Sequence, residues 1–94
     1  MKSRANSAFR KLLADLPRNV REQAVAAYLL FRANPWHPSL HYKRVHPTRA
    51  IMSVRVGGDY RAVGIQREPG AILWFWIGPH EQYETLLSNL KNRK

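Results

Sequence analysis

The stretch AILWFWIGPHEQYETLL, residues 71–87, decides the fold that we expect for this chain. Its first seven residues are all apolar, which is typical of a β-strand covered on both faces. Gly78 and Pro79 then interrupt the run. Glycine is a good N-cap, proline suits the first helical position, and Glu81 can complete a capping box. The sequence therefore predicts a buried strand that leads directly into an amphipathic helix.

Upstream of this stretch, the hydrophobic period indicates two strands joined by a tight turn. Residues 51–56 alternate in polarity, Gly57-Gly58 is a turn signal, and residues 60–65 resume as a partner strand. The preceding residues 34–49 form a proline-rich connection, with room for a short strand at 41–45. These segments predict an antiparallel sheet.

The N-terminal third of the chain has helical periodicity. Apolar residues predict one helix over residues 5–15 and a second that follows Pro17 and stops at Asn34. We therefore expect one α+β domain over residues 1–94. Its N-terminal helical hairpin packs on a small antiparallel sheet of three to four strands, and a helix ends the chain. We expect the chain to begin in a helix, with no strand ahead of it.

The charge of the chain is strongly positive. Sixteen Lys and Arg residues face six Asp and Glu residues, giving a formal net charge of +10, and they are spread from Lys2 to Lys94. Such a surface is typical of a protein that meets a polyanion or an acidic protein, although the charge can also serve solubility alone. There is no cysteine and no long apolar run, so we expect a cytoplasmic protein with no disulfide and no membrane partner.

A histidine and a tyrosine stand three residues apart at the start of the last helix, so they project from one face. The positive end of the helix dipole disfavours a protonated His80, and a neutral imidazole is a usable proton acceptor. The alternative is that Tyr83 belongs to the core and His80 is ordinary polar surface. Leu86, Leu87 and Leu90 continue this helix as an apolar stripe that is either core or a docking site.

Two arginines flank the Gly57-Gly58 turn. A two-residue loop would put Arg55 and Arg61 on opposite faces of the sheet, whereas a three-residue loop would make them cross-strand neighbours. As neighbours beside His80, they could clamp a phosphate. The alternative is that both arginines are ordinary exposed strand residues. The histidines of the proline-rich connection have no cysteine or carboxylate nearby, so we expect neither a metal nor a cofactor.

Four stretches together resemble the RelE/ParE superfamily of toxins from type II toxin–antitoxin modules. They are FRKLLADLPRNVREQA, NPWHPSLHYKRV, SVRVGGDYRAVGI and WFWIGPHEQYETLL. The resemblance spans nearly the whole chain, and its most specific parts are the RVGGDYRA hairpin and the apolar strand that runs into Gly-Pro-His. It implies the RelE/ParE-like fold and a cognate acidic antitoxin.

RelE-type members resemble small ribonucleases that cut mRNA in the ribosomal decoding site without metal. By this resemblance, Arg61 would bind the scissile phosphate with help from Arg55. His80 would be the base or acid, and Tyr83 would orient the nucleotide or transfer a proton. Three basic residues would contact RNA, and they are Lys43, Arg44 and Arg49.

The same resemblance leaves two other functions open. A ParE-type member would inhibit DNA gyrase without nuclease chemistry, and a non-toxic relative would only bind a partner. The sequence does not decide between ribosome and gyrase as the target.

Overall fold

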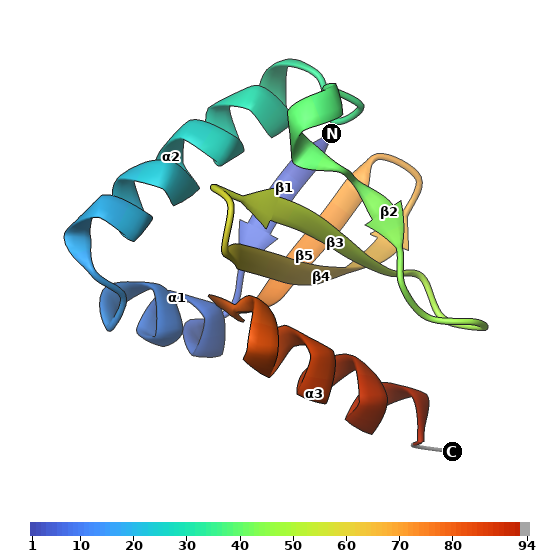
Figure 1. Ribbon diagram of the computed structural model, residues 1–94. Helices are drawn as coiled ribbons and strands as arrows, with labels where there is room; N and C mark the ends of the chain where they lie inside the picture. Colours follow the sequence, from blue (N-terminus) through green and yellow to red (C-terminus); the bar gives the residue numbers. More distant parts are fainter. Residues whose placement is uncertain (93–94) are drawn as a thin grey trace.

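A computed structural model describes residues 1–92, which form a five-stranded sheet with helices on both faces (Figure 1). The strand order is β1-β5-β4-β3-β2. The strands are β1 (Lys2–Ala5), β2 (Lys43–Arg44), β3 (Ile51–Val56), β4 (Tyr60–Glu68) and β5 (Ala71–Pro79). Neighbours from β2 to β5 are antiparallel, as expected, and β1 runs parallel to β5.

Strand β1 corrects the prediction that the chain begins in a helix. Residues Lys2 to Ala5 pair with residues Ala71 to Trp74 of β5, so the sheet is mixed and has five strands. The four residues KSRA lack a strand-like apolar pattern, and tertiary contacts hold them instead. The Trp74 indole Nε1 donates to Ser3 Oγ at 2.6 Å, which ties the edge strand to the core.

The helices enclose two separate apolar layers. They are α1 (Ser7–Ala14), α2 (Arg18–Ala33), the short 3₁₀ helix η1 (Pro38–Leu40) and α3 (His80–Lys91). The predicted hairpin of α1 and α2 covers one face of the sheet, where Phe31 packs edge-to-face on Trp74. Helix α3 covers part of the other face, where Tyr83 packs with Ile51 and Val63. Within residues 1–92, no helix has the length and apolar character that crossing a membrane requires.

The junction of β5 and α3 differs from the predicted cap by one residue. Gly78 lies inside β5, opposite Arg61. A Cβ at Gly78 would approach the Trp76 ring to 2.6 Å, so the close packing of that ring requires glycine here. Pro79 is the N-cap residue, and no side chain caps the helix, so the capping box expected with Glu81 is not formed.

The first backbone N–H of α3 finds its acceptor on the β3–β4 turn. His80 N donates to the carbonyl of Asp59 at 2.8 Å. A helix start needs acceptors for its unpaired N–H groups, and this bond supplies one from another part of the chain. It also fixes the position of His80 relative to the turn that precedes Arg61.

Candidate active site

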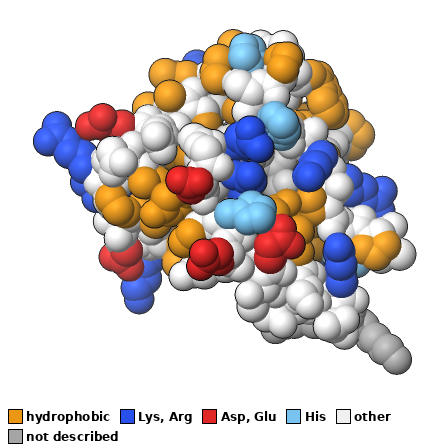
Figure 2. Space-filling view, viewed as in Figure 1, with side chains coloured by type: hydrophobic (Ala, Val, Ile, Leu, Met, Phe, Trp, Pro, Cys, Tyr) orange, Lys and Arg blue, Asp and Glu red, His pale blue; other side chains and the backbone are white. Residues whose placement is uncertain are grey.

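A hollow of about 650 Å³ lies between β2, the end of β4 next to the turn, and helix α3. Four cationic side chains line it, and they are Lys43, Arg44, Arg61 and Lys91. His80 and Tyr83 line it as well, and Glu84 is its only carboxylate among the described residues. Figure 2 shows Lys and Arg side chains gathered around histidines on the face that carries α3. The hollow is therefore a cationic concavity that contains an imidazole, a side chain able to accept or donate a proton.

Arg61 is held by the turn that precedes it. Its Nη1 donates to the carbonyls of Tyr60 at 2.8 Å and Gly58 at 3.2 Å. The remaining guanidinium nitrogens make no hydrogen bond to residues 1–92, and the side chain is half-exposed. A guanidinium held on one edge presents its other N–H groups to a phosphate in a defined direction.

His80 has a carboxylate partner one helical turn away. Its Nε2 lies 3.3 Å from Glu84 Oε1, and the two side chains are 49% and 63% exposed. A carboxylate in this position orients the imidazole and stabilises the imidazolium that forms during proton transfer. Sequence reasoning missed Glu84, although the i,i+4 spacing from His80 was a signal that could have found it.

Tyr83 belongs to the core, as one of the two sequence interpretations has it. Its side chain is 4% exposed, and its hydroxyl lies 3.1 Å from Ser53 Oγ. The ring also lies beside the His80 ring, with 5.7 Å between centroids. Tyr83 thus lines the hollow with a ring whose hydroxyl already has a buried partner.

Arg55 is the candidate that the structure separates from the others. The β3–β4 loop contains three residues, 57–59, and Arg55 lies opposite Arg61 in the strand register. Yet Arg55 does not line the hollow that holds His80. It lines a second hollow beside α2, and its Nε is buried with no hydrogen-bond partner among the described residues.

The three predicted nucleic-acid contacts occupy different positions. Lys43 is exposed and lines the hollow. Arg44 lines it too, but its Nε donates to the carbonyls of His46 at 3.0 Å and Arg49 at 3.1 Å, so it organises the following loop. The Arg49 side chain lies outside the hollow. The loop is further held by His46, whose Nδ1 accepts from the Arg49 N–H and whose Nε2 donates to the Leu90 carbonyl.

The residues that build this site lie within a recognisable domain. The family model described as ParE-like toxin domain matches residues 18–85, well over half of the chain. The chain belongs to this family of ParE-like toxin domains. The matched region contains β2 to β5 and the site residues Lys43, Arg61, His80 and Glu84, whereas Lys91 lies outside it. No curated protein matches the chain by sequence.

Solved structures confirm the fold of this ParE-like domain. The RelB–RelE antitoxin–toxin complex of Methanococcus jannaschii matches at a TM-score of 0.68 with 15% identity, over 88% of this chain and 96% of that one. The RelE–RelB complex of Pyrococcus horikoshii matches at 0.65 with 16% identity, over 83% and 92%. The RelBE2 toxin–antitoxin complex of Mycobacterium tuberculosis matches at 0.55 with 20% identity, over 84% and 96%.

Proposed function

We propose that this ParE-like toxin domain is the toxin of a type II toxin–antitoxin pair and that it cleaves mRNA on the ribosome without a metal. The antitoxin part is supported by the solved relatives, which are complexes of toxins with antitoxins. The nuclease part is carried by one observation, which is that His80, with Glu84 beside it, shares a cationic hollow with Arg61 and Lys43.

The chemistry of metal-free RNA cleavage matches these groups. The ribose 2′-OH attacks the adjacent phosphate, and the 5′-oxygen of the next nucleotide leaves. This gives a 2′,3′-cyclic phosphate and a free 5′-hydroxyl. The reaction needs a base for the 2′-OH, an acid for the departing oxygen, and cations for the charge of the phosphorane.

In the proposed site, the His80 imidazole is the base that takes the proton of the 2′-OH or the acid that protonates the departing 5′-oxygen, and solvent water fills the other role. Glu84 orients that imidazole. Arg61 offers guanidinium N–H groups to the phosphorane oxygens, and the Lys43 ammonium attracts the RNA backbone. The Tyr83 ring packs beside the His80 ring, and the Tyr83 hydroxyl is engaged with Ser53. Arg55 has no role in this scheme, because it lines a different hollow.

DNA gyrase inhibition is the second candidate, and the ParE-like description of the matching family favours it. The two functions differ in what stops first in the cell. Induced expression should halt incorporation of a labelled amino acid within minutes if mRNA is cut, and incorporation of labelled thymidine should stop first if gyrase is the target. Co-expression of the cognate antitoxin should relieve the arrest in either case, and unimpeded growth at high soluble expression would refute the toxin proposal.

A further inference from the structure

One tryptophan stands outside the core. Trp74 lies in one apolar layer, and Trp76, like the leucines of α3, packs in the other. Trp36, in contrast, is 68% exposed, the highest value among the large hydrophobic side chains of residues 1–92. A single exposed apolar side chain is common on proteins, so the surroundings of Trp36 decide whether its ring has a use.

The Trp36 ring is held in a fixed orientation. Its backbone N–H donates to Asn34 Oδ1 at 3.1 Å, and its ring packs on Tyr42, with 5.1 Å between centroids and 59° between the ring planes. Tyr42 is itself buried and packs edge-to-face on Phe31 of α2. One side of the indole thus rests on a buried aromatic cluster, and the rest is open to solvent. Because the ring is already ordered, binding to it would cost little conformational entropy.

The loop that carries Trp36 is cationic. Residues 34–49 contain three Lys or Arg residues and three histidines, but no Asp or Glu. One of these histidines, His41, is exposed and has a φ of 48°, and no other non-glycine residue among 1–92 has a positive φ. Its left-handed backbone ends η1 and turns the chain into β2. Such a conformation costs energy, and here it returns Tyr42 to the Trp36 ring.

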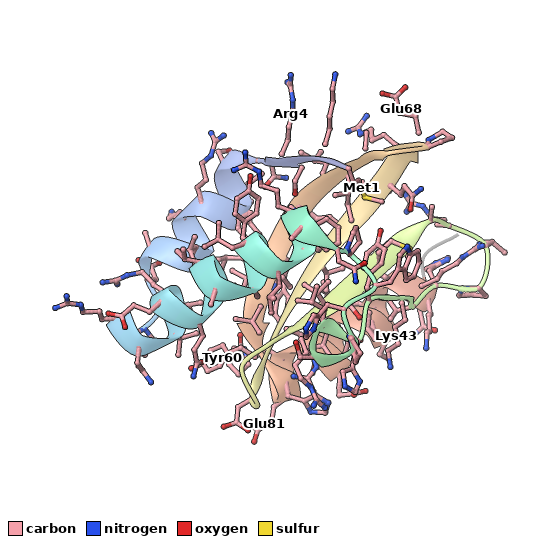
Figure 3. All side chains as sticks on the ribbon, turned by 90° about the horizontal axis from the view of Figure 1, so that it is seen from above. Met1, Arg4, Lys43, Tyr60, Glu68 and Glu81 are labelled. Carbon is pink, nitrogen blue, oxygen red and sulfur yellow. The ribbon has the colours of Figure 1, made fainter. Side chains whose placement is uncertain are left out.

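The open ring and the cationic hollow lie on the two sides of one edge strand. Strand β2 is the last strand of the sheet, at the edge opposite the one that carries Arg4 (Figure 3). Tyr42 belongs to the apolar layer that α2 covers, whereas the next residue, Lys43, lines the hollow that contains His80. An RNA strand that leaves the hollow past Lys43 and rounds the β2 edge would therefore meet the indole.

We propose that Trp36 is a stacking platform for an unpaired RNA base near the cleaved bond, with Tyr42 behind its ring and Lys43 on a neighbouring phosphate. This inference rests on the proposed ribonuclease function. Aromatic side chains hold single-stranded bases in this way, and every base has a π-face, so the platform would add affinity without a sequence preference. The base comes from the message or from ribosomal RNA, which offer the same chemistry.

The test compares two substitutions that both keep an apolar side chain over Tyr42. Trp36→Phe keeps an aromatic face, and Trp36→Leu removes it. On programmed ribosomes, Trp36→Leu should raise the KM of cleavage about 5- to 100-fold with kcat near the parental value, and Trp36→Phe should stay within about threefold of the parent. Arg4→Gln, at the opposite sheet edge, is the control and should match the parent. All three variants should melt close to the parent.

Salt dependence separates stacking from charge. Trp36→Leu should weaken ribosome binding by the same factor at every salt concentration, whereas Lys43→Gln should reduce the slope of log affinity against log salt by about one. A message with an abasic nucleotide beside the cleaved bond identifies the source of the base. If this message removes the difference between Trp36→Leu and the parent, the base belongs to the message. A difference that persists on ribosomes without a message assigns the base to ribosomal RNA.

Two results would overturn the platform and leave the ribonuclease function standing. One is a parental KM in Trp36→Leu, and weaker antitoxin binding by that variant would then assign the ring to the antitoxin. The other is an equal rise of KM in the Leu and Phe variants. A parent that neither binds ribosomes nor cuts mRNA would instead refute the proposed function, and this inference with it.

Discussion

The hydroxyls of Tyr83 and Ser53 lie 3.1 Å apart in the interior between α3 and β3. The two residues are 4% and 2% exposed, so water does not replace either partner readily. The bond fixes the first turns of α3 on the sheet, and His80 stands one turn before Tyr83. The orientation of the proposed proton-transfer group thus depends on a buried contact.

Tyr83→Phe should therefore lower stability. The change leaves the buried Ser53 hydroxyl without its partner, which should lower the free energy of unfolding by about 1–3 kcal/mol. Urea unfolding measures the loss, and Tyr83→Phe/Ser53→Ala should recover part of it. Cleavage rates separate packing from chemistry, because a rate loss in Tyr83→Phe that Ser53→Ala does not share would reveal a working hydroxyl. An unchanged stability of Tyr83→Phe would contradict the structural role.

Glu84→Gln should slow RNA cleavage without unfolding the protein. The amide keeps the shape of the side chain but no longer stabilises an imidazolium at His80. We expect the cleavage rate to fall by a factor of about 10 to 100, the upper value being typical of losing a general acid or base. Glu81→Gln is the matched control, since it removes the same charge from the first turn of the same helix. Equal rates in the two variants would remove Glu84 from the proposed site.

Gly78→Ala should destabilise the β5–α3 junction. The added methyl group would meet the Trp76 ring at 2.6 Å, and overpacking of this kind costs about 1–3 kcal/mol. Gly58→Ala is the control, because nothing lies within 4 Å of a Cβ at that position. Thermal unfolding should show a lower midpoint for Gly78→Ala alone. Equal midpoints in the two variants would mean that the Trp76 ring moves aside without cost.

Ionisation of Tyr42 should lower the stability of the fold at alkaline pH. Burial raises the pKa of the Tyr42 phenol above its usual value of about 10. As pH rises above about 10, the unfolded chain releases the Tyr42 proton more readily than the folded chain does. The contribution of the Tyr42 phenol to stability is therefore complete below about pH 10 and is lost as pH rises further. Urea unfolding across this range should show a steeper alkaline loss for the parent than for Tyr42→Phe. Parallel loss in both proteins would contradict this prediction.

Strong local patterns made most of the fold predictable. The alternating residues of β3, the uniformly apolar β5 and the periodic faces of α1 and α2 formed the elements expected of them. Strand β1 was missed because its four residues carry two charges, and pairing with β5 supplies what the sequence lacks. The start of α3 was misplaced by one residue. The acceptor for its first backbone N–H is the Asp59 carbonyl, which lies 21 positions earlier in the chain, so local sequence could not indicate it.

The candidate site was predictable only in its chemistry. Residue types at the start of α3 and on the hairpin indicated His80 and Arg61, and the structure brings both to one hollow. The register also settles the loop length that the sequence left open. The separation of Arg55 could not be foreseen, because register alone pairs it with Arg61 and only the packing around α2 takes it to another hollow.

Cleavage of a defined mRNA on programmed ribosomes tests the central claim most directly. The parent should cut the message in the decoding site, with a 2′,3′-cyclic phosphate on the 5′ fragment. Arg61→Ala should lose about 100- to 1000-fold in rate and His80→Ala about 100-fold or more. Both variants should melt close to the parent, since neither change opens a core cavity. Parental cleavage by both variants, or a parent that never cleaves but blocks gyrase, would contradict the ribonuclease assignment.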